Sequence, residues 1–265
     1  MTQSRSFPIG APILEVKDIS LSFGGVKAIT RSSFSVLAHE IKAIIGPNGA
    51  GKSSMLNCIQ GIYKPQEGSI AFKGTVLEKI SPNIIAQKGI SRTFQNLALF
   101  KRMSVLDNIL VGRKLHMAAN FLQVAFQTPK ARAEEKDNRE RCEEIVEFLE
   151  IQSIRDTPVG KLPYGLQKKV ELGRALATEA EVLLLDEPMA GMNVEEKREM
   201  CRFILKVNDE LGTTMVLIEH DMGVVMDISD NVVVLDYGKI IADGPPDEVR
   251  SNQDVIDAYL GVAHD

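Results

Sequence analysis

Short aliphatic runs alternate with stretches of helical periodicity along most of the chain. Residues 41–45, 182–185 and 215–218 form such runs, and Lys42 is their only polar member. Runs without a polar face are typical of strands in a parallel sheet that helices cover on both sides. The alternation of these strands with helices predicts an α/β fold with a mostly parallel sheet.

Two other regions have a different pattern. Residues 13–23 and 33–37 alternate loosely between apolar and polar positions, which predicts an antiparallel β subdomain near the N-terminus. From about residue 105 to residue 177 the strand pattern is absent, and helical spacing replaces it. One apolar face at i, i+3, i+4 and i+7 is formed by Cys142, Ile145, Val146 and Leu149. We therefore expect an α-helical subdomain inserted into the α/β core.

Composition places the chain among ordinary soluble globular proteins. Of its 265 residues, 44% are hydrophobic and 25% are charged, and the formal net charge is −5. There is no basic tract, so we expect no nucleic-acid partner. The N-terminus lacks the apolar stretch of a signal peptide, and no apolar run approaches the roughly 18 residues that span a bilayer. We expect a cytoplasmic protein that reaches a membrane only through a partner.

The segment at residues 46–53 matches the phosphate-binding pattern GxxxxGK[ST] at every fixed position, between an aliphatic run and a helical one. Glycines let consecutive backbone N–H groups converge on a phosphate, and the helix N-terminus adds partial positive charge. We assign Lys52 to the β- and γ-phosphates of ATP and the Ser53 hydroxyl to Mg²⁺. These features predict a P-loop NTPase core of the RecA-like type. Its expected nucleotide contacts are Gly46, Pro47, Asn48, Gly49, Ala50, Gly51, Lys52, Ser53 and Ser54.

Two adjacent carboxylates, Asp186 and Glu187, follow the aliphatic run at residues 182–185. At the carboxyl end of a parallel strand they would face the nucleotide crevice. A chance pair of surface acids is the alternative, but charge directly after four aliphatic residues is costly without a purpose. We expect Asp186 to support the metal and Glu187 to polarise the attacking water.

With these motifs in this order, the chain resembles the ATP-binding subunits of ATP-binding cassette (ABC) transporters over about residues 14–261. The resemblance places Phe23 against adenine. It also implies that Gln95, in the run TFQN, joins the core to the helical subdomain and contacts the metal and the attacking water. His220, in the run IEHD, matches the family's switch histidine. The signature loop, which in the family contacts the nucleotide of a partner subunit, is represented here by Pro163, Tyr164 and Gly165.

The resemblance also implies an organisation and a set of partners. The chain divides into a tail at residues 1–12 and an ABC nucleotide-binding domain at residues 13–262, with the helical subdomain at about 97–180. The family implies a homodimer, or a heterodimer with a second ABC ATPase subunit, bound to two transmembrane permease subunits. An extracytoplasmic solute-binding protein takes part indirectly. ATP hydrolysis would then drive transport from the cytoplasmic face of the inner membrane.

Two positions depart from the family's pattern. Pro163 stands where the signature loop commonly has a serine whose hydroxyl contacts the γ-phosphate. Proline offers neither a hydroxyl nor a backbone donor, so we expect a weaker contact between subunits without loss of ATP binding. Gly165 is kept, and a helix N-terminus still favours an anion. Asn193 stands where aspartate is common, which removes a charge from a turn that links the subunits.

The end of the chain resembles one branch of the family. The AYLG run at residues 258–261 and the long helical insertion at residues 113–141 are similar to the ATPases of branched-chain amino acid importers. Urea, other amino acids and the export of lipid or lipopolysaccharide stay open as alternatives. So do a soluble ABC ATPase without a transport role and a binding-only subunit. A GTPase is disfavoured because the guanine-reading NKxD pattern is absent.

Overall fold

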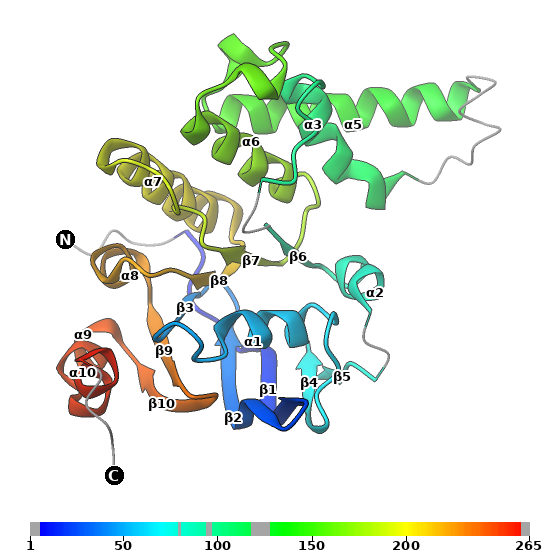
Figure 1. Cartoon of the computed structure of the whole chain (residues 1–265). Coiled ribbons are helices and arrows are strands. Elements are labelled where there is room, and N and C mark those ends of the chain that lie inside the picture. Colours follow the sequence, from blue (N-terminus) through cyan, green and yellow to red (C-terminus); the bar gives the residue numbers. More distant parts are fainter. Residues whose placement is uncertain (1–5, 79–80, 94–96, 118–127, 261–265) are drawn as a thin grey trace.

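The computed structural model describes residues 6–78, 81–93, 97–117 and 128–260. Within these ranges the larger sheet has the strand order β10-β9-β3-β8-β7-β6 (Figure 1). Only β10 runs antiparallel to its neighbour in this sheet. The mostly parallel sheet is therefore confirmed. Its strands are β3 (Ile41–Ile45), β6 (Ile90–Arg92), β7 (Val182–Asp186), β8 (Thr214–Ile218), β9 (Asn231–Asp236) and β10 (Lys239–Gly244).

A smaller, antiparallel sheet has the order β2-β1-β4-β5, which confirms the predicted β subdomain. Its second strand begins at residue 26 and not at residue 33, because it pairs with the first strand along nearly its whole length. Helix α1 (Lys52–Ile59) lies between the two sheets, where its Leu56 shares one apolar cluster with Leu14 and Val216. The strands are β1 (Pro12–Phe23), β2 (Val26–Leu37), β4 (Glu67–Phe72) and β5 (Thr75–Val76).

The described residues between β6 and β7 form helices and no strand, as the helical spacing predicts. Cys142, Val146 and Leu149 are fully buried, and Ile145 packs against the same cluster. This cluster continues into Leu183 of β7, so the helical region and the sheet share apolar packing. The elements are α3 (Val105–Gly112), η1 (Arg113–His116), α5 (Pro129–Phe148), η2 (Gln152–Ile154), η3 (Val159–Lys161) and α6 (Tyr164–Leu176), drawn in green in Figure 1.

Five further helices complete the described fold, and none of the described helices is long and apolar enough to cross a membrane. Because β3, β7 and β8 are adjacent and parallel, the segments that follow them emerge at one edge of the sheet. That edge is where ligands bind in open α/β sheets. The helices are α2 (Pro82–Gln87), α7 (Val194–Leu211), α8 (Met222–Ile228), α9 (Pro246–Ser251) and α10 (Gln253–Leu260).

Candidate nucleotide-binding site

The turn after β3 can be built only with glycine at two of its positions. At Gly46 φ is 146°, and a Cβ atom would lie 2.0 Å from the carbonyl oxygen of Leu235. At Gly51 φ is 103°, and a Cβ atom would lie 2.4 Å from the carbonyl oxygen of Ala28. Both glycines therefore allow a close backbone approach that holds the turn against β9 and β2.

Lys52 is the first residue of α1, and its ammonium group points back over the turn. Its Nζ donates hydrogen bonds to the carbonyl oxygens of Gly46 (2.7 Å) and Pro47 (2.9 Å). Burial lowers the pKa of Lys52, and the nearby carboxylates of Glu187 and Asp186 oppose this shift. A largely desolvated ammonium held by neutral carbonyls is well placed to take the charge of a phosphate instead.

The N-terminus of α1 is open to an anion. Gly51 precedes it and supplies no side-chain cap, so the first N–H groups of the helix are not satisfied by a side chain. Ser53 on the first turn is exposed, as are Asn48 and Gly49 of the preceding turn. These residues combine accessible donors with the positive end of a helix, which is the arrangement that binds phosphate.

Asp186 is the last residue of β7 and is almost completely buried, with 2% of its side chain exposed. Its Oδ2 accepts a hydrogen bond from Nη2 of Arg92 at 2.6 Å. Arg92 in turn donates to Asn57 (2.7 Å) and Gln60 (3.0 Å), at the end of α1. Arg92 thus fixes the orientation of the carboxylate, a role that the sequence pattern did not indicate.

The other oxygen of Asp186, Oδ1, is buried and has no hydrogen-bond partner among the described residues. An unsatisfied buried carboxylate oxygen is costly unless a cation completes it. Mg²⁺ accepts such an oxygen together with hydroxyl and phosphate oxygens, so Asp186 and Ser53 fit this metal. Gln95, the third expected ligand, lies outside the described residues. Two residues before it, the Thr93 hydroxyl accepts a hydrogen bond from the N–H of Asp186 at 3.3 Å.

Glu187 and His220 meet at the tips of β7 and β8. The ring Nε2–H of His220 donates to Oε1 of Glu187 at 2.8 Å. The buried Glu219 joins the segments that follow β7 and β8. Its two carboxylate oxygens accept hydrogen bonds from the N–H groups of Met189 (2.8 Å) and His220 (3.2 Å). Burial raises the pKa of Glu219, which these hydrogen bonds oppose. A carboxylate oriented by a histidine can accept a proton from water.

Phe23 ends β1 with 45% of its residue surface exposed. Its ring lies edge-on to Tyr63, with centroids 5.0 Å apart and an interplanar angle of 70°. An exposed aromatic ring held by a second ring is suited to stacking on a nucleotide base. Tyr63 follows α1 closely in the chain, yet no spacing in the sequence points to this pair.

The predicted signature loop lies against α7. Pro163 precedes α6 with φ −53° and makes no side-chain cap, and the ring of Tyr164 lies next to Gly191. A Cβ atom at Gly165 would lie 2.5 Å from Oε1 of Glu196, so a larger residue at position 165 would have to displace this carboxylate. The contacts of the loop are therefore with the start of α7 and the turn before it, and the N-terminus of α6 carries no side-chain cap.

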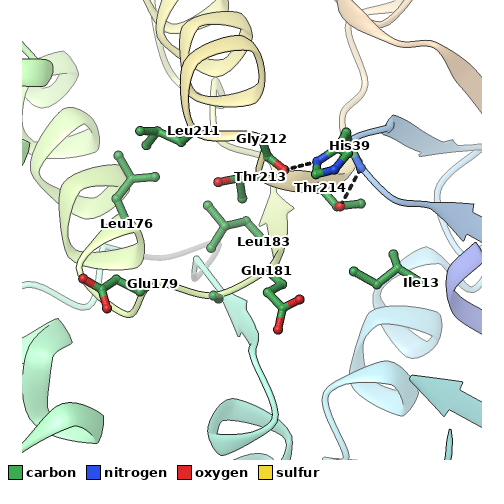
Figure 2. A pocket seen from close by; sticks show the side chains of 11 residues that line it. Ile13, His39, Leu176, Glu179, Glu181, Leu183, Leu211, Gly212, Thr213 and Thr214 are labelled. Carbon is green, nitrogen blue, oxygen red and sulfur yellow. Dashed lines mark hydrogen bonds between the residues drawn. The ribbon is translucent and has the colours of Figure 1, made fainter. Parts of the chain in front are cut away.

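A separate hollow of about 390 Å³ lies at the opposite edge of the sheet, where the strands begin (Figure 2). His39 lines it, and its ring Nδ1–H donates to the carbonyl oxygen of Gly212 at 2.5 Å. The backbone N–H of His39 donates to the hydroxyl of Thr214 at 2.9 Å. These bonds join the start of β8 to the turn before β3, so His39 serves the fold at this edge.

Comparison with known proteins agrees with this site. A family model described as ABC transporter matches residues 29–190, more than half of the chain, and one described as Branched-chain amino acid ATP-binding cassette transporter matches residues 239–265. The chain is 40% identical to the high-affinity branched-chain amino acid transport ATP-binding protein BraF of Pseudomonas aeruginosa, over 95% of this chain and 99% of BraF. It is 37% identical to LivG of Escherichia coli K12, which has the same description, over the same shares of the two chains.

Solved structures agree with the fold. The crystal structure of MJ1267 in its ADP conformation, described as an ATP-binding cassette of an ABC transporter, has a TM-score of 0.82 and 33% identity. The match covers 94% of this chain and 99% of MJ1267. Together with the family model and the relatives, this likeness shows that the chain belongs to the ABC transporter family, as an ATP-binding cassette.

Proposed function

We propose that this chain is the ATP-hydrolysing subunit of a transporter that imports branched-chain or related amino acids. The observation that carries the proposal is the similarity of this chain to BraF and LivG along nearly the full length of each. The arrangement of Lys52, Asp186 and Glu187 around one edge of the sheet supports it. The match of residues 239–265 to a branched-chain amino acid transporter model supports the same solute class.

In the proposed reaction, the turn at residues 46–51 and the start of α1 bind the β- and γ-phosphates of ATP, and the Lys52 ammonium exchanges its carbonyl partners for phosphate oxygens. Glu187 orients the attacking water and accepts its proton, while His220 holds the carboxylate in place. Phe23 and Tyr63 provide the platform for adenine. Bound Mg²⁺ supplies charge neutralisation at the phosphates, and Ser53, Asp186 and Gln95 would hold it.

A second ABC ATPase subunit, identical or not, would complete the site. In this proposal the signature loop at residues 163–165 meets the nucleotide bound by the partner. The N-terminus of α6, which no side chain caps, would then direct its N–H groups and partial positive charge at that nucleotide. This accounts for a loop whose contacts within its own chain leave the helix end open.

Two permease subunits would bind next to Arg92, beside the nucleotide site. A hollow of about 700 Å³ between α2, β6 and α6 is lined partly by exposed apolar side chains, Phe100, Leu115 and Met117. Exposed apolar surface of this kind marks a site for a protein partner. Arg92 also lines it, so a permease segment seated there would act directly on the residue that orients Asp186. The chain would lie on the cytoplasmic face of the membrane, and the solute-binding protein would contact only the permeases.

A transporter of the same family with another solute is the second candidate, because the site described here binds nucleotide and not solute. The test is reconstitution of the chain with its co-purifying membrane subunits and solute-binding protein in vesicles. We expect ATP-dependent uptake of leucine, isoleucine or valine, and none with Lys52→Ala; Lys17→Ala, at an exposed position of the small sheet, serves as control. Uptake of urea alone would favour the second candidate, and a rate of ATP hydrolysis that is the same for the chain alone and for its membrane complex would favour a soluble ATPase.

A further inference from the structure

Glu187 has a backbone conformation that a residue with a side chain keeps only when its surroundings hold it. Its φ is 49°, in the left-handed region that favours glycine. Its N–H donates to the carbonyl oxygen of Ile218 at 2.9 Å, and its carbonyl oxygen accepts from the N–H of Ala190 at 3.2 Å. The backbone around Glu187 therefore determines where its carboxylate points.

The carboxylate of Glu219 holds this backbone just beyond Glu187. Met189 lies two residues after Glu187, and its N–H donates to Oε1 of Glu219 at 2.8 Å. Met189 is 0% exposed and Glu219 is 5% exposed. Because both residues are buried, the Met189 N–H depends on this carboxylate for the hydrogen bond that a buried N–H requires.

The other oxygen of Glu219 acts on the neighbouring strand end. β7 and β8 lie side by side (Figure 1), and Glu219 directly follows β8. Its Oε2 accepts from the N–H of His220 at 3.2 Å, and the ring of His220 reaches Oε1 of Glu187 at 2.8 Å. One buried carboxylate thus fixes the backbone at His220 and the backbone two residues after Glu187.

We propose that Glu219 is a positioning residue for ATP hydrolysis. By accepting both N–H groups, it keeps the Glu187 carboxylate and the His220 ring in the relative orientation in which Glu187 takes a proton from water. The inference rests on the proposed hydrolysis of ATP at this site. The phosphate-binding turn follows β3, and the Lys52 ammonium is held there by two carbonyl oxygens of that turn. Glu219 should therefore act on turnover and not on nucleotide affinity.

The segments after β7 and β8 stay joined when Glu219 is changed. The hydrogen bond between the N–H of Glu187 and the carbonyl oxygen of Ile218 is independent of it. At the surface, Nζ of Lys197 on α7 donates to Oδ2 of Asp221 at 2.6 Å. We therefore expect conservative variants of Glu219 to fold.

The test is Glu219→Gln in the full-length chain, assembled with its co-purifying membrane subunits. The amide keeps one acceptor oxygen, so one of the two N–H groups loses its partner. Glu219→Asp is the second variant, because it keeps the charge but its shorter side chain does not reach both N–H groups. The matched control is Glu40→Gln. Glu40 is 2% exposed and its Oε2 accepts from the N–H of Leu37 at 2.7 Å, but it precedes β3 at the edge of the sheet opposite the nucleotide site.

We would measure kcat and KM for ATP, the Kd for MgATP and the melting temperature of each variant. We expect both Glu219 variants to lower kcat about ten- to a hundredfold, the range by which a misplaced catalytic group slows a reaction. Their KM and Kd should stay close to the wild-type values. Glu40→Gln should melt at a temperature similar to that of Glu219→Gln and keep the wild-type kcat.

A wild-type kcat in both Glu219 variants, or an equal loss of kcat in Glu40→Gln, would overturn the role of Glu219 and leave the proposed function standing. A Kd that rises in step with the loss of kcat would also overturn it, because Glu219 would then act on nucleotide binding. A loss of kcat in Glu219→Gln but not in Glu219→Asp would assign the effect to charge and overturn the positioning role. A wild-type complex that hydrolyses no ATP would overturn both proposals.

Discussion

The Nε2 atom of His220 lies 2.8 Å from Oε1 of Glu187, although the two residues are 33 positions apart. Sheet register brings them together. Asp186 and Ile218 are paired in the ladder between β7 and β8, and the N–H of Glu187 donates to the carbonyl oxygen of Ile218 at 2.9 Å. The side chains of Glu187 and His220 therefore leave the sheet at nearly the same level along the two strands. The parallel pairing of β7 and β8 fixes the geometry of the pair.

Glu187→Gln should stop hydrolysis without stopping ATP binding. The amide oxygen still accepts the hydrogen bond from His220 but is not a base, so we expect turnover to fall about 10²- to 10⁴-fold. With ATP and Mg²⁺ the variant should accumulate as a dimer on sizing chromatography, because uncleaved ATP stays between two subunits. Glu195→Gln, an exposed carboxylate on α7, is the control. A wild-type chain that is a tight dimer without nucleotide would contradict this idea.

Arg92→Lys should weaken the metal-supporting carboxylate. A lysine ammonium lacks the planar fork that joins Asp186 to Asn57 and Gln60, so at least one hydrogen bond is lost. We expect the free energy of unfolding in urea to fall by about 1–3 kcal/mol. ATP affinity should weaken more with Mg²⁺ present than in a chelator. Arg102→Lys on the surface is the control, and equal losses with and without Mg²⁺ would argue against a link to the metal.

The sequence predicts those parts of the site whose residues are close together in the chain, and it does not predict the parts that depend on residues far apart. The phosphate-binding turn lies between its strand and its helix in one contiguous segment, so pattern alone predicts that Lys52 lies over the turn. Arg92 belongs to a strand of only three residues, without periodicity, and its partner Asp186 is 94 positions away. Only the strand order places β6 next to β7, and the sequence does not contain that order in readable form.

The residues that stabilise the site residues are hard to predict for the same reason, because their contacts are with residues distant in the sequence. Glu219 follows the predicted strand at residues 215–218 and could be read as one more surface acid, yet it is buried and accepts two backbone hydrogen bonds. Its burial follows from the turn at Met189 folding back over β8. The roles of the predicted site residues themselves, Gln95 included, stay predictions until the substitutions proposed here are measured.

Phe23→Ala should weaken ATP binding by about 1–2 kcal/mol, since stacking of a base on an aromatic ring is worth about that much. Tyr63→Ala should give a smaller loss of the same sign, because it removes the ring that holds Phe23 edge-on at 5.0 Å. Calorimetry with ATP would measure both. Val26→Ala, also exposed in the same hairpin, should leave the affinity unchanged. If Phe23→Ala behaves like Val26→Ala, Phe23 is a plain structural residue.

Glu219→Gln should alter the pH dependence of stability in a defined direction. Burial raises the pKa of Glu219 above 4.5 in the folded chain. At pH values between 4.5 and this raised pKa, the carboxyl group keeps its proton in the folded chain and has lost it in the unfolded chain. The contribution of Glu219 to the free energy of unfolding is therefore largest below pH 4.5 and falls as the pH rises through the folded pKa. Urea titrations at pH 4–7 should show the wild-type advantage over the variant shrinking with rising pH. Glu210→Gln, an exposed carboxylate, should leave the wild-type profile unchanged.

Pro163 is the residue before the first turn of α6. Serine is a good residue at this position, because its oxygen accepts a hydrogen bond from a free N–H of the helix. Its O–H proton remains available for the γ-phosphate of a partner subunit. Proline offers neither, but its ring restrains the unfolded chain, and losing that restraint costs about 0.4–1 kcal/mol.

The two effects can be separated by comparing Pro163→Ser with Pro163→Ala, since both lose the ring and only serine gains a hydroxyl. A charge-assisted hydrogen bond to phosphate contributes about 1.5–3 kcal/mol to association, whereas the loss of the ring acts on the free energy of unfolding. In the Glu187→Gln background we therefore expect Pro163→Ser to tighten the ATP-bound dimer, by sedimentation or sizing, and Pro163→Ala to leave it nearly unchanged. ATP affinity measured at dilutions where the chain is monomeric should be the same for both, because position 163 meets only the nucleotide of the other subunit. A serine variant with altered monomer affinity would place this loop at its own nucleotide and not across the dimer.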